Sequence, residues 1–224
     1  MKRQKLHTIC LILFVLYGSA VLGKTNSRPD NNVNMYGSLF LQPRGLEGSP
    51  YVFKDWSIGT VNLYNGQTAS DLLVKFNILS NDLIFYNEKF KNLFTADRET
   101  VSSFTMETQD GQKLLFIKYN DESLGYKLNK GDFVHQIYDG KLQLLIKYSA
   151  SISDANELNS RDKINPLTYY FVIDSHEATE IRLKLKSIIK LYPDRKQEIK
   201  KLASQLHFRK NSVGHMVQLI KAIE

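Results

Sequence analysis

The stretch from Gly48 to Asn87, GSPYVFKDWSIGTVNLYNGQTASDLLVKFNILSNDLIFYN, decides the fold. Apolar and polar residues alternate in Thr60–Tyr64 and Leu72–Ile78, and a third apparent strand, Leu83–Tyr86, follows. A period of two is typical of a half-buried β-strand, because successive side chains point to opposite faces of the sheet. Asn65-Gly66 and Ser80-Asn81-Asp82 separate the segments with residues that tolerate a positive φ or bond their own backbone. The stretch therefore predicts a meander of antiparallel strands.

Further hairpins are expected along the chain. The Asp-Gly pairs at 110–111 and 139–140 favour type I′ turns, which need a positive φ at both central residues. Residues 89–100 are interpreted as a loop with a short strand near Leu93-Phe94. The paired strands expected are Val101–Thr108 with Lys113–Tyr119, Asp132–Tyr138 with Lys141–Tyr148, and Thr168–Ile173 with Thr179–Leu183.

Near Lys186 the hydrophobic period lengthens to that of a helix. Pro193 ends a first short helix and suits the first turn of the next, where its missing N–H is no loss. Ser212 is expected to cap a third helix. The fold class predicted is mainly β: an antiparallel β-sandwich or open barrel built of hairpins over residues 47–185. Two or three C-terminal helices over residues 186–224 are expected to pack on it.

The first 23 residues have the pattern of a secretory signal peptide. Three basic residues precede the uncharged run Ile9–Tyr17, and small residues follow it. We expect cleavage before Lys24, with a cut after Ala20 as the alternative. A membrane anchor is the other interpretation, but the run is about half of the roughly 20 residues that span a bilayer. The only cysteine, Cys10, lies in this segment, so we expect neither a disulfide nor a thiolate metal site in the mature chain.

Two polar stretches are expected to lack regular structure. Residues 24–46 begin polar and are poor in large apolar side chains, so we expect a flexible lead before the β domain. Residues 150–167, ASISDANELNSRDKINPL, form the longest polar interruption of the strand pattern. Because loops longer than about 12–15 residues are commonly functional or disordered, we expect a disordered polar loop there.

The chain resembles a family of uncharacterised exported proteins of Bacteroidota. The resemblance rests on GSPYVFKDWSIGTVNLYNG, the strand pair after it, and the ending YYFVIDSHEATEIRLKLKSIIKLYPDRKQEIKKL. It spans most of the chain beyond the signal peptide and depends on glycines, aromatic residues and a helix pattern. It implies secretion across the inner membrane and a β-rich body, and it implies no reaction and no functional residues.

No motif in the sequence indicates a catalytic, cofactor-binding or metal site. His135 alternates with apolar residues, so it faces the core or lies at an edge. The run Asp174-Ser175-His176 contains the residue types of a catalytic triad, but neighbours on one turn do not converge as a triad requires. The sequence has no phosphate-cradling glycine loop, GxSxG or HExxH motif. We therefore expect no enzymatic activity, no cofactor and no metal; a periplasmic hydrolase is the least favoured alternative.

Charge is distributed unevenly along the chain. Residues 182–224 contain eleven Lys/Arg against three Asp/Glu, whereas residues 24–181 contain sixteen against twenty. A basic helical end on a mildly acidic body suits contact with an anionic membrane surface, and solvated helix faces are the alternative interpretation. Nucleic acid is disfavoured, because aromatic residues do not interleave with the basic ones as stacking platforms. The candidate contact residues are Lys190, Arg195, Lys196, Lys200, Lys201, Arg209 and Lys210.

These observations predict an exported protein, periplasmic or secreted, that serves as a non-enzymatic envelope-associated binding or scaffold protein. Its expected partner is an anionic membrane surface or another envelope protein. The alternative is a carrier that encloses a small apolar ligand in the β body. An enclosed apolar cavity would favour the carrier, convergent titratable groups in a cleft would favour an enzyme, and a filled core would leave the surface as the functional part.

Overall fold

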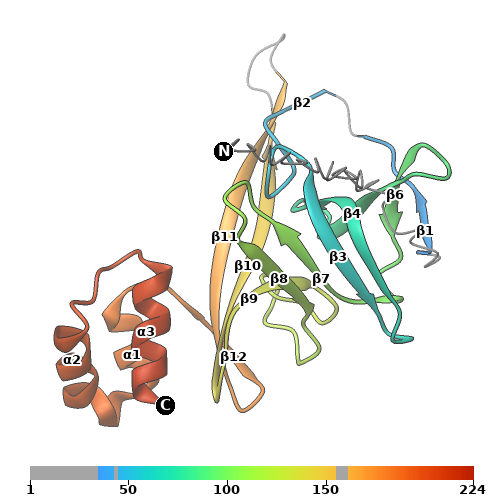
Figure 1. Cartoon of the computed structure of the whole chain (residues 1–224). Helices are drawn as coiled ribbons and strands as arrows, with labels where there is room; N and C mark the ends of the chain where they lie inside the picture. The colour runs from blue at the N-terminus through green and yellow to red at the C-terminus, as the bar shows by residue number, and fades with distance from the viewer. Residues whose placement is uncertain (1–34, 43–44, 155–160) are drawn as a thin grey trace, which may run out of the picture. The chain divides into compact units, whose positions relative to one another are not determined.

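The computed structural model describes residues 35–42, 45–154 and 161–224 (Figure 1). Within these residues the strands form one open sheet in the order β1-β6-β5-β4-β3-β7-β8-β9-β10-β11-β12, and β2 pairs with β11. All neighbours are antiparallel except β2 and β11. The mainly β class with C-terminal helices is confirmed. The strands are β1 Gly37–Leu39, β2 Leu46–Glu47, β3 Ser57–Leu63, β4 Thr68–Asn77, β5 Asp82–Asn87, β6 Asn92–Ala96, β7 Val101–Glu107, β8 Lys113–Lys118, β9 Phe133–Asp139, β10 Leu142–Ser153, β11 Asp162–Asp174 and β12 Glu177–Ile181.

The sheet curls strongly around an aromatic core. β4 and β9 are four strands apart in the sheet order, which in a flat sheet would separate them by about 19 Å, at about 4.8 Å per strand. The rings of Phe76 in β4 and Phe133 in β9 nevertheless lie 6.5 Å apart between centroids. Phe104 and Phe116 fill the space between them, with ring centroids 4.7 Å apart. These four rings are fully buried and form the centre of the first hydrophobic cluster.

Asn81 joins the two sides of this curl. It lies in the β4–β5 turn with a φ of 57° and is buried. Its Nδ2 donates to the carbonyl of Phe133 over 3.0 Å, and its Oδ1 accepts from the backbone N–H of Phe133 over 2.7 Å. The side chain thus bonds to β9 as a neighbouring strand would. Arg98 holds the turn, because it donates to the Asp82 carboxylate and to the Asn81 carbonyl, over 2.9 Å each.

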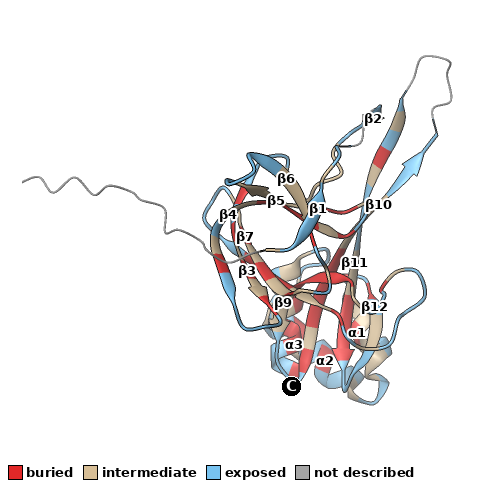
Figure 2. Cartoon of the chain, turned by 90° about the vertical axis from the view of Figure 1, so that its right-hand side faces the viewer, coloured by how far each residue is buried: buried red, intermediate tan, exposed pale blue. Residues whose placement is uncertain are grey.

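Three helices cover the end of the sheet formed by β9 to β12. They are α1 Leu185–Leu191, α2 Lys196–Gln205, preceded by the 3₁₀ turn Pro193–Arg195, and α3 Val213–Ile223. As predicted, Pro193 opens the turn before α2 and the Ser212 hydroxyl caps α3, accepting from the backbone N–H of His215 over 3.3 Å. The buried cluster that joins helices to strands includes Leu144, Val172, Ile188, Ile199, Met216, Leu219 and Ile220. Buried positions follow the strands and the inner helix faces in Figure 2.

A third cluster lies under the segment between β8 and β9. Tyr119 and Leu128 of this segment pack with Phe171 and other side chains of β9 to β11. Below it, the ammonium of Lys147 pairs with the Asp132 carboxylate, and both side chains are buried. The same carboxylate accepts from the backbone N–H of Asn129 over 2.7 Å. The segment is thereby fixed on the sheet, and this positions residues 120–124 beside the β11–β12 turn.

Several boundaries differ from the sequence-based expectations. The predicted flexible lead, 24–46, contains β1, which pairs with β6, and the start of β2, which pairs with β11. The predicted polar loop, 150–167, is wrong over most of its length, since residues 150–153 of β10 pair with 163–166 of β11. Backbone hydrogen bonds form this ladder without a continuous apolar face. Pro166 fits there because β12 pairs with β11 only from Tyr170 onward, which leaves one side of β11 unpaired at Pro166.

Turn types also differ. Gly111 has a φ of 81° while Asp110 keeps a negative φ, and Gly140 has no positive φ, so neither Asp-Gly pair forms the predicted type I′ turn. A Cβ on Gly140 would lie 2.5 Å from a carboxylate oxygen of Glu224, so that side chain would have to shift. The turn between β11 and β12 instead has two consecutive residues with a positive φ, Ser175 at 48° and His176 at 72°.

The predicted signal peptide, 1–23, lies outside the described residues. Within the described residues no helix is long and apolar enough to cross a membrane.

Candidate functional site

Most of the basic residues predicted to form a contact surface are exposed on the helical layer, which comprises residues 182–224. Lys190 lies on α1, three lysines lie on α2, and Arg209 and Lys210 lie in the α2–α3 connection. No hydrogen bond or ion pair forms between these side chains and any other described residue. The six exposed and unpaired side chains are Lys190, Lys196, Lys200, Lys201, Arg209 and Lys210. They form the basic helical surface.

Arg195, the seventh candidate, has a structural position instead. It is only half exposed, and its guanidinium forms a bidentate pair with Glu198, with both N···O distances 2.8 Å. Hydrogen bonding to Arg195 lowers the pKa of Glu198. The Nη1 of Arg195 also donates to the carbonyl of Ile223 over 2.5 Å, and this joins the start of α2 to the end of α3. Three of its five N–H donors are thus engaged within the helical layer, so we do not count Arg195 in the basic helical surface.

The acidic residues of the helical layer are mostly engaged as well. Glu198 is held by Arg195, and the Glu224 carboxylate accepts from the Tyr138 hydroxyl over 2.6 Å and from the backbone N–H of Leu142 over 2.8 Å. Asp194 is the remaining acid and is exposed. The charge of the basic helical surface is therefore not neutralised by local ion pairs. Lys184 and Lys186 are also exposed, and Lys186 lies one helical turn from Lys190, so the sequence-based list omitted neighbours of this surface.

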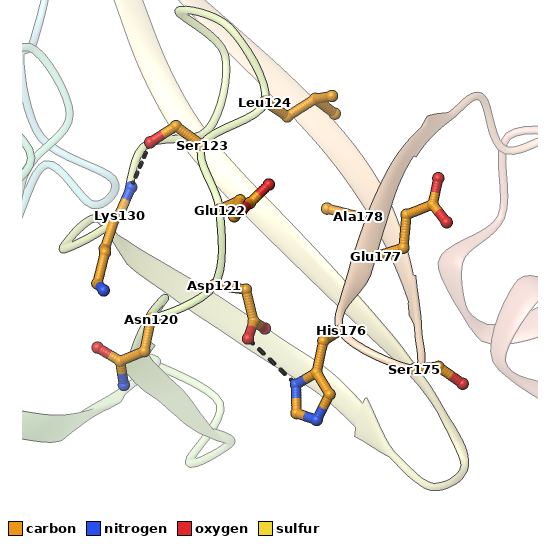
Figure 3. Close-up of a pocket in the computed structure, with 10 residues that line it drawn as sticks. All are labelled: Asn120, Asp121, Glu122, Ser123, Leu124, Lys130, Ser175, His176, Glu177 and Ala178. Carbon is orange, nitrogen blue, oxygen red and sulfur yellow. Dashed lines mark hydrogen bonds and ion pairs between the residues drawn. The ribbon is translucent and has the colours of Figure 1, made fainter.

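A second candidate lies where the β11–β12 turn meets residues 120–124 (Figure 3). The hollow measures about 560 Å³. The His176 Nδ1 lies 3.1 Å from an Asp121 carboxylate oxygen, and these two residues are 55 positions apart in the chain. Glu122, Glu177 and Lys130 complete its charged lining. Nothing in the sequence signalled this contact, because it depends on how the segment after β8 folds back over the sheet.

The residues of this hollow do not form a catalytic triad. The Ser175 hydroxyl donates to the neighbouring Asp174 carboxylate over 3.1 Å, and Figure 3 shows it directed away from the His176 ring. A triad needs the serine hydroxyl within hydrogen-bond reach of the imidazole. Asp174 is also the acceptor of the Tyr192 hydroxyl, at 2.9 Å. Among the described residues, no group of three His, Cys, Asp or Glu side chains is placed to hold a metal ion.

His135 is a core residue, the first of the two positions expected from its strand. Its ring stacks with those of Phe116 and Tyr148, with centroids 5.4 and 6.0 Å away. Its Nδ1 lies 3.0 Å from the Tyr148 hydroxyl oxygen. Burial lowers the pKa of His135 to about 4 and raises the pKa of Tyr148 to about 12. Desolvation thus keeps both groups neutral near pH 7, so this pair has the properties of a satisfied core contact.

Comparison of the chain with known protein families, with curated proteins and with solved structures finds no match. The resemblance to exported proteins of Bacteroidota stays a prediction.

Proposed function

We propose that this is an exported, non-enzymatic, envelope-associated binding protein whose basic helical surface contacts an anionic membrane surface. The observation that carries the proposal is the set of six exposed basic side chains without ion-pair partners among the described residues. The acids beside them, Glu198 and Glu224, are engaged by hydrogen bonds. An uncompensated positive layer of this kind attracts anionic lipid headgroups.

The interior of the curled sheet gives less support to the carrier alternative. The rings of Phe76, Phe104, Phe116 and Phe133 occupy the space that a ligand would need inside the curl. A filled core favours a function at the surface. The hydrolase alternative has little support from the Asp121–His176 hollow, where the imidazole contacts a carboxylate and not a nucleophile.

The expected binding strength follows from charge number and screening. Each Lys or Arg near an anionic leaflet contributes about 1 kcal/mol at best, so six give an upper limit of about 6 kcal/mol. The Debye length shrinks from about 10 Å at 0.1 M salt to about 3 Å at 1 M. Binding should therefore weaken sharply between about 50 and 300 mM salt.

Co-sedimentation with vesicles tests the proposal. The protein should pellet at low salt with vesicles of phosphatidylserine and phosphatidylcholine, and remain in the supernatant with phosphatidylcholine alone. The triple variant Lys196→Glu, Lys200→Glu, Lys201→Glu should lose binding and keep its thermal stability, because these positions are exposed. Lys196 and Lys200 lie about 40° apart around α2, and Lys201 lies about 100° from Lys200, so the three cover a broad outer face.

A matched control makes the same charge change away from the helices. Lys89→Glu, Lys113→Glu and Lys130→Glu alter three exposed lysines of the β domain. This variant should bind the anionic vesicles nearly as well as the parent. Equal pelleting with both vesicle types, pelleting with neither at low salt, or equal loss in the two triple variants would contradict the proposal.

A further inference from the structure

A hollow of about 530 Å³ lies on the outer face of the sheet, where β3 begins and β7 ends. Its lining combines aromatic and aliphatic side chains with polar ones, as ligand sites do. One wall comes from residues 53–58 and the other from residues 107–110. It is distinct from the basic helical surface, and no motif in the sequence indicated it.

The strand register explains how the two walls meet. Ile58 of β3 pairs with Leu73 of β4, and Gly59 pairs with Met106 of β7, which places Ile58 opposite Glu107. Val61 and the other core residues of β3 point to the buried face, so Ile58 points outward. The hollow is therefore formed by outward side chains of neighbouring strands and by the turn after β7.

The wall formed by residues 53–58 has an apolar, exposed surface. Trp56 is 37 % exposed and Ile58 is 41 % exposed, and Phe53 lies beside them, half buried. An exposed tryptophan next to an exposed isoleucine leaves a flat apolar surface in water. Trp side chains are enriched at binding surfaces, because they supply a large rigid contact area with little loss of rotamer freedom.

The Trp56 ring is held in place from its own side of the sheet. The Lys75 Nζ lies 5.1 Å from the centroid of the Trp56 ring and 4.6 Å from that of Tyr51. The same ammonium donates to the carbonyl of Lys54 over 2.7 Å. The aromatic wall is thus fixed before any ligand arrives, which reduces the ordering cost of binding.

The rim of the hollow provides hydrogen-bond acceptors and donors together. Asp55, Glu107 and Asp110 supply carboxylates, of which Glu107 has no hydrogen-bond partner among the described residues. Gln109 supplies an amide, and its Nε2 donates to Asp55 over 2.9 Å. Lys54, an exposed residue, also lines the hollow.

From this arrangement we infer that the hollow binds a neutral sugar ring of a glycan. The apolar C–H face of the ring would lie on Trp56 and Ile58, and its hydroxyls would reach the rim. Each hydroxyl both donates and accepts, so it can use the carboxylate of Glu107 and a donor such as Gln109 at once. A cationic ligand fits less well, because the ammonium of Lys75 already lies over the Trp56 ring.

Trp56 is the only tryptophan of the chain, so its fluorescence reports on this hollow alone. The full chain would be titrated with cellohexaose, chitohexaose, mannohexaose and laminarihexaose up to about 5 mM, a range that detects a Kd of about 1 mM. At least one oligosaccharide should shift the emission saturably. Tetramethylammonium and pentalysine test the cationic alternative.

Variants then locate the binding by calorimetry. Trp56→Ala and Glu107→Gln should each weaken binding of the responding oligosaccharide by about tenfold or more. Tyr126→Ala, which removes an aromatic side chain that is 81 % exposed elsewhere, should leave binding unchanged. If Trp56→Ala fails to fold, Ile58→Ser takes its place.

The inference is overturned if none of the four oligosaccharides binds, if Tyr126→Ala weakens binding as much as Glu107→Gln does, or if only the cationic probes shift the emission. Vesicle binding does not enter this test. Its outcome is therefore independent of the proposed membrane contact.

Discussion

The hydrophobic cores at the two ends of the sheet are built from different kinds of side chain. Inside the curl of β3 to β9, the buried cluster is built on phenylalanines from several strands. At the helix-covered end, the buried members of the cluster are aliphatic residues and methionine. A sheet that bends back on itself leaves a wide gap, which large flat rings bridge from both sides. Helices approach strands closely, and branched aliphatic side chains interdigitate there. The contrast shows that side chains of one sheet can form two hydrophobic cores with different packing.

Both cores share β9, so we expect them to unfold together. On one face of this strand Phe133 belongs to the aromatic cluster, and Ile137 packs against the helix-covered one. Phe76→Ala should cost about 3–5 kcal/mol through lost burial and a cavity, and Ile220→Ala about 2–5 kcal/mol. Urea unfolding followed by Trp56 fluorescence and by far-UV circular dichroism should give one coincident transition for each variant. Separate transitions would show that the helical layer is an independent unit.

Much of the aromatic core could be predicted from local sequence, because alternation in β4 identifies Phe76 as inward-facing. The curl could not be predicted, since it brings Phe76 near Phe133, far along the chain, through the summed twist of several strands. β1 was missed because it is a three-residue edge strand whose residues are all exposed. The pairing of residues 150–153 with 163–166 was missed because polar strands lack a hydrophobic period.

The candidate sites follow the same division. The exposure of Lys201 could be expected from the helical period, because it lies about 160° around α2 from the buried residues Ile199 and Ala203. Lys196 lies only about 20° around the helix from Ala203, so its exposure could not be expected in this way. The ion pair of Arg195 with Glu198 could be predicted, because a spacing of three positions places both side chains on one helix surface. The Asp121–His176 contact and the Trp56 hollow could not be predicted, because both join segments about 50 residues apart.

His135, in the strand β9 that both cores share, should make the protein sensitive to acid. His135 has a pKa of about 4 in the folded state, against about 6.5 unfolded, so below pH 6.5 the unfolded chain binds the proton first. Its contribution is present above pH 6.5 and is lost as the pH falls to 4, a loss of about 3 kcal/mol. Urea midpoints at pH 7, 5.5 and 4.5 should show this decline.

The double variant His135→Phe, Tyr148→Phe removes the titrating group and leaves no unpaired hydroxyl behind. It should flatten the pH dependence in that window by the same amount. A parent-like decline in the double variant would mean that other groups cause the acid loss.

The smallest expected effects on stability are those of substitutions at Arg195 and Lys196, two neighbouring residues at the start of α2. Arg195 donates to Glu198 and to the carbonyl of Ile223, so Arg195→Ala removes a link within the helical layer. Lys196 is exposed, and its side chain forms no hydrogen bond or ion pair with other described residues. Arg195→Ala should lower the melting temperature measurably, by less than either core substitution. Lys196→Ala should leave the melting temperature unchanged and weaken anionic vesicle binding, because it removes a free charge. The reverse pattern would place the membrane contact on Arg195 and remove the reason for excluding it from the basic helical surface.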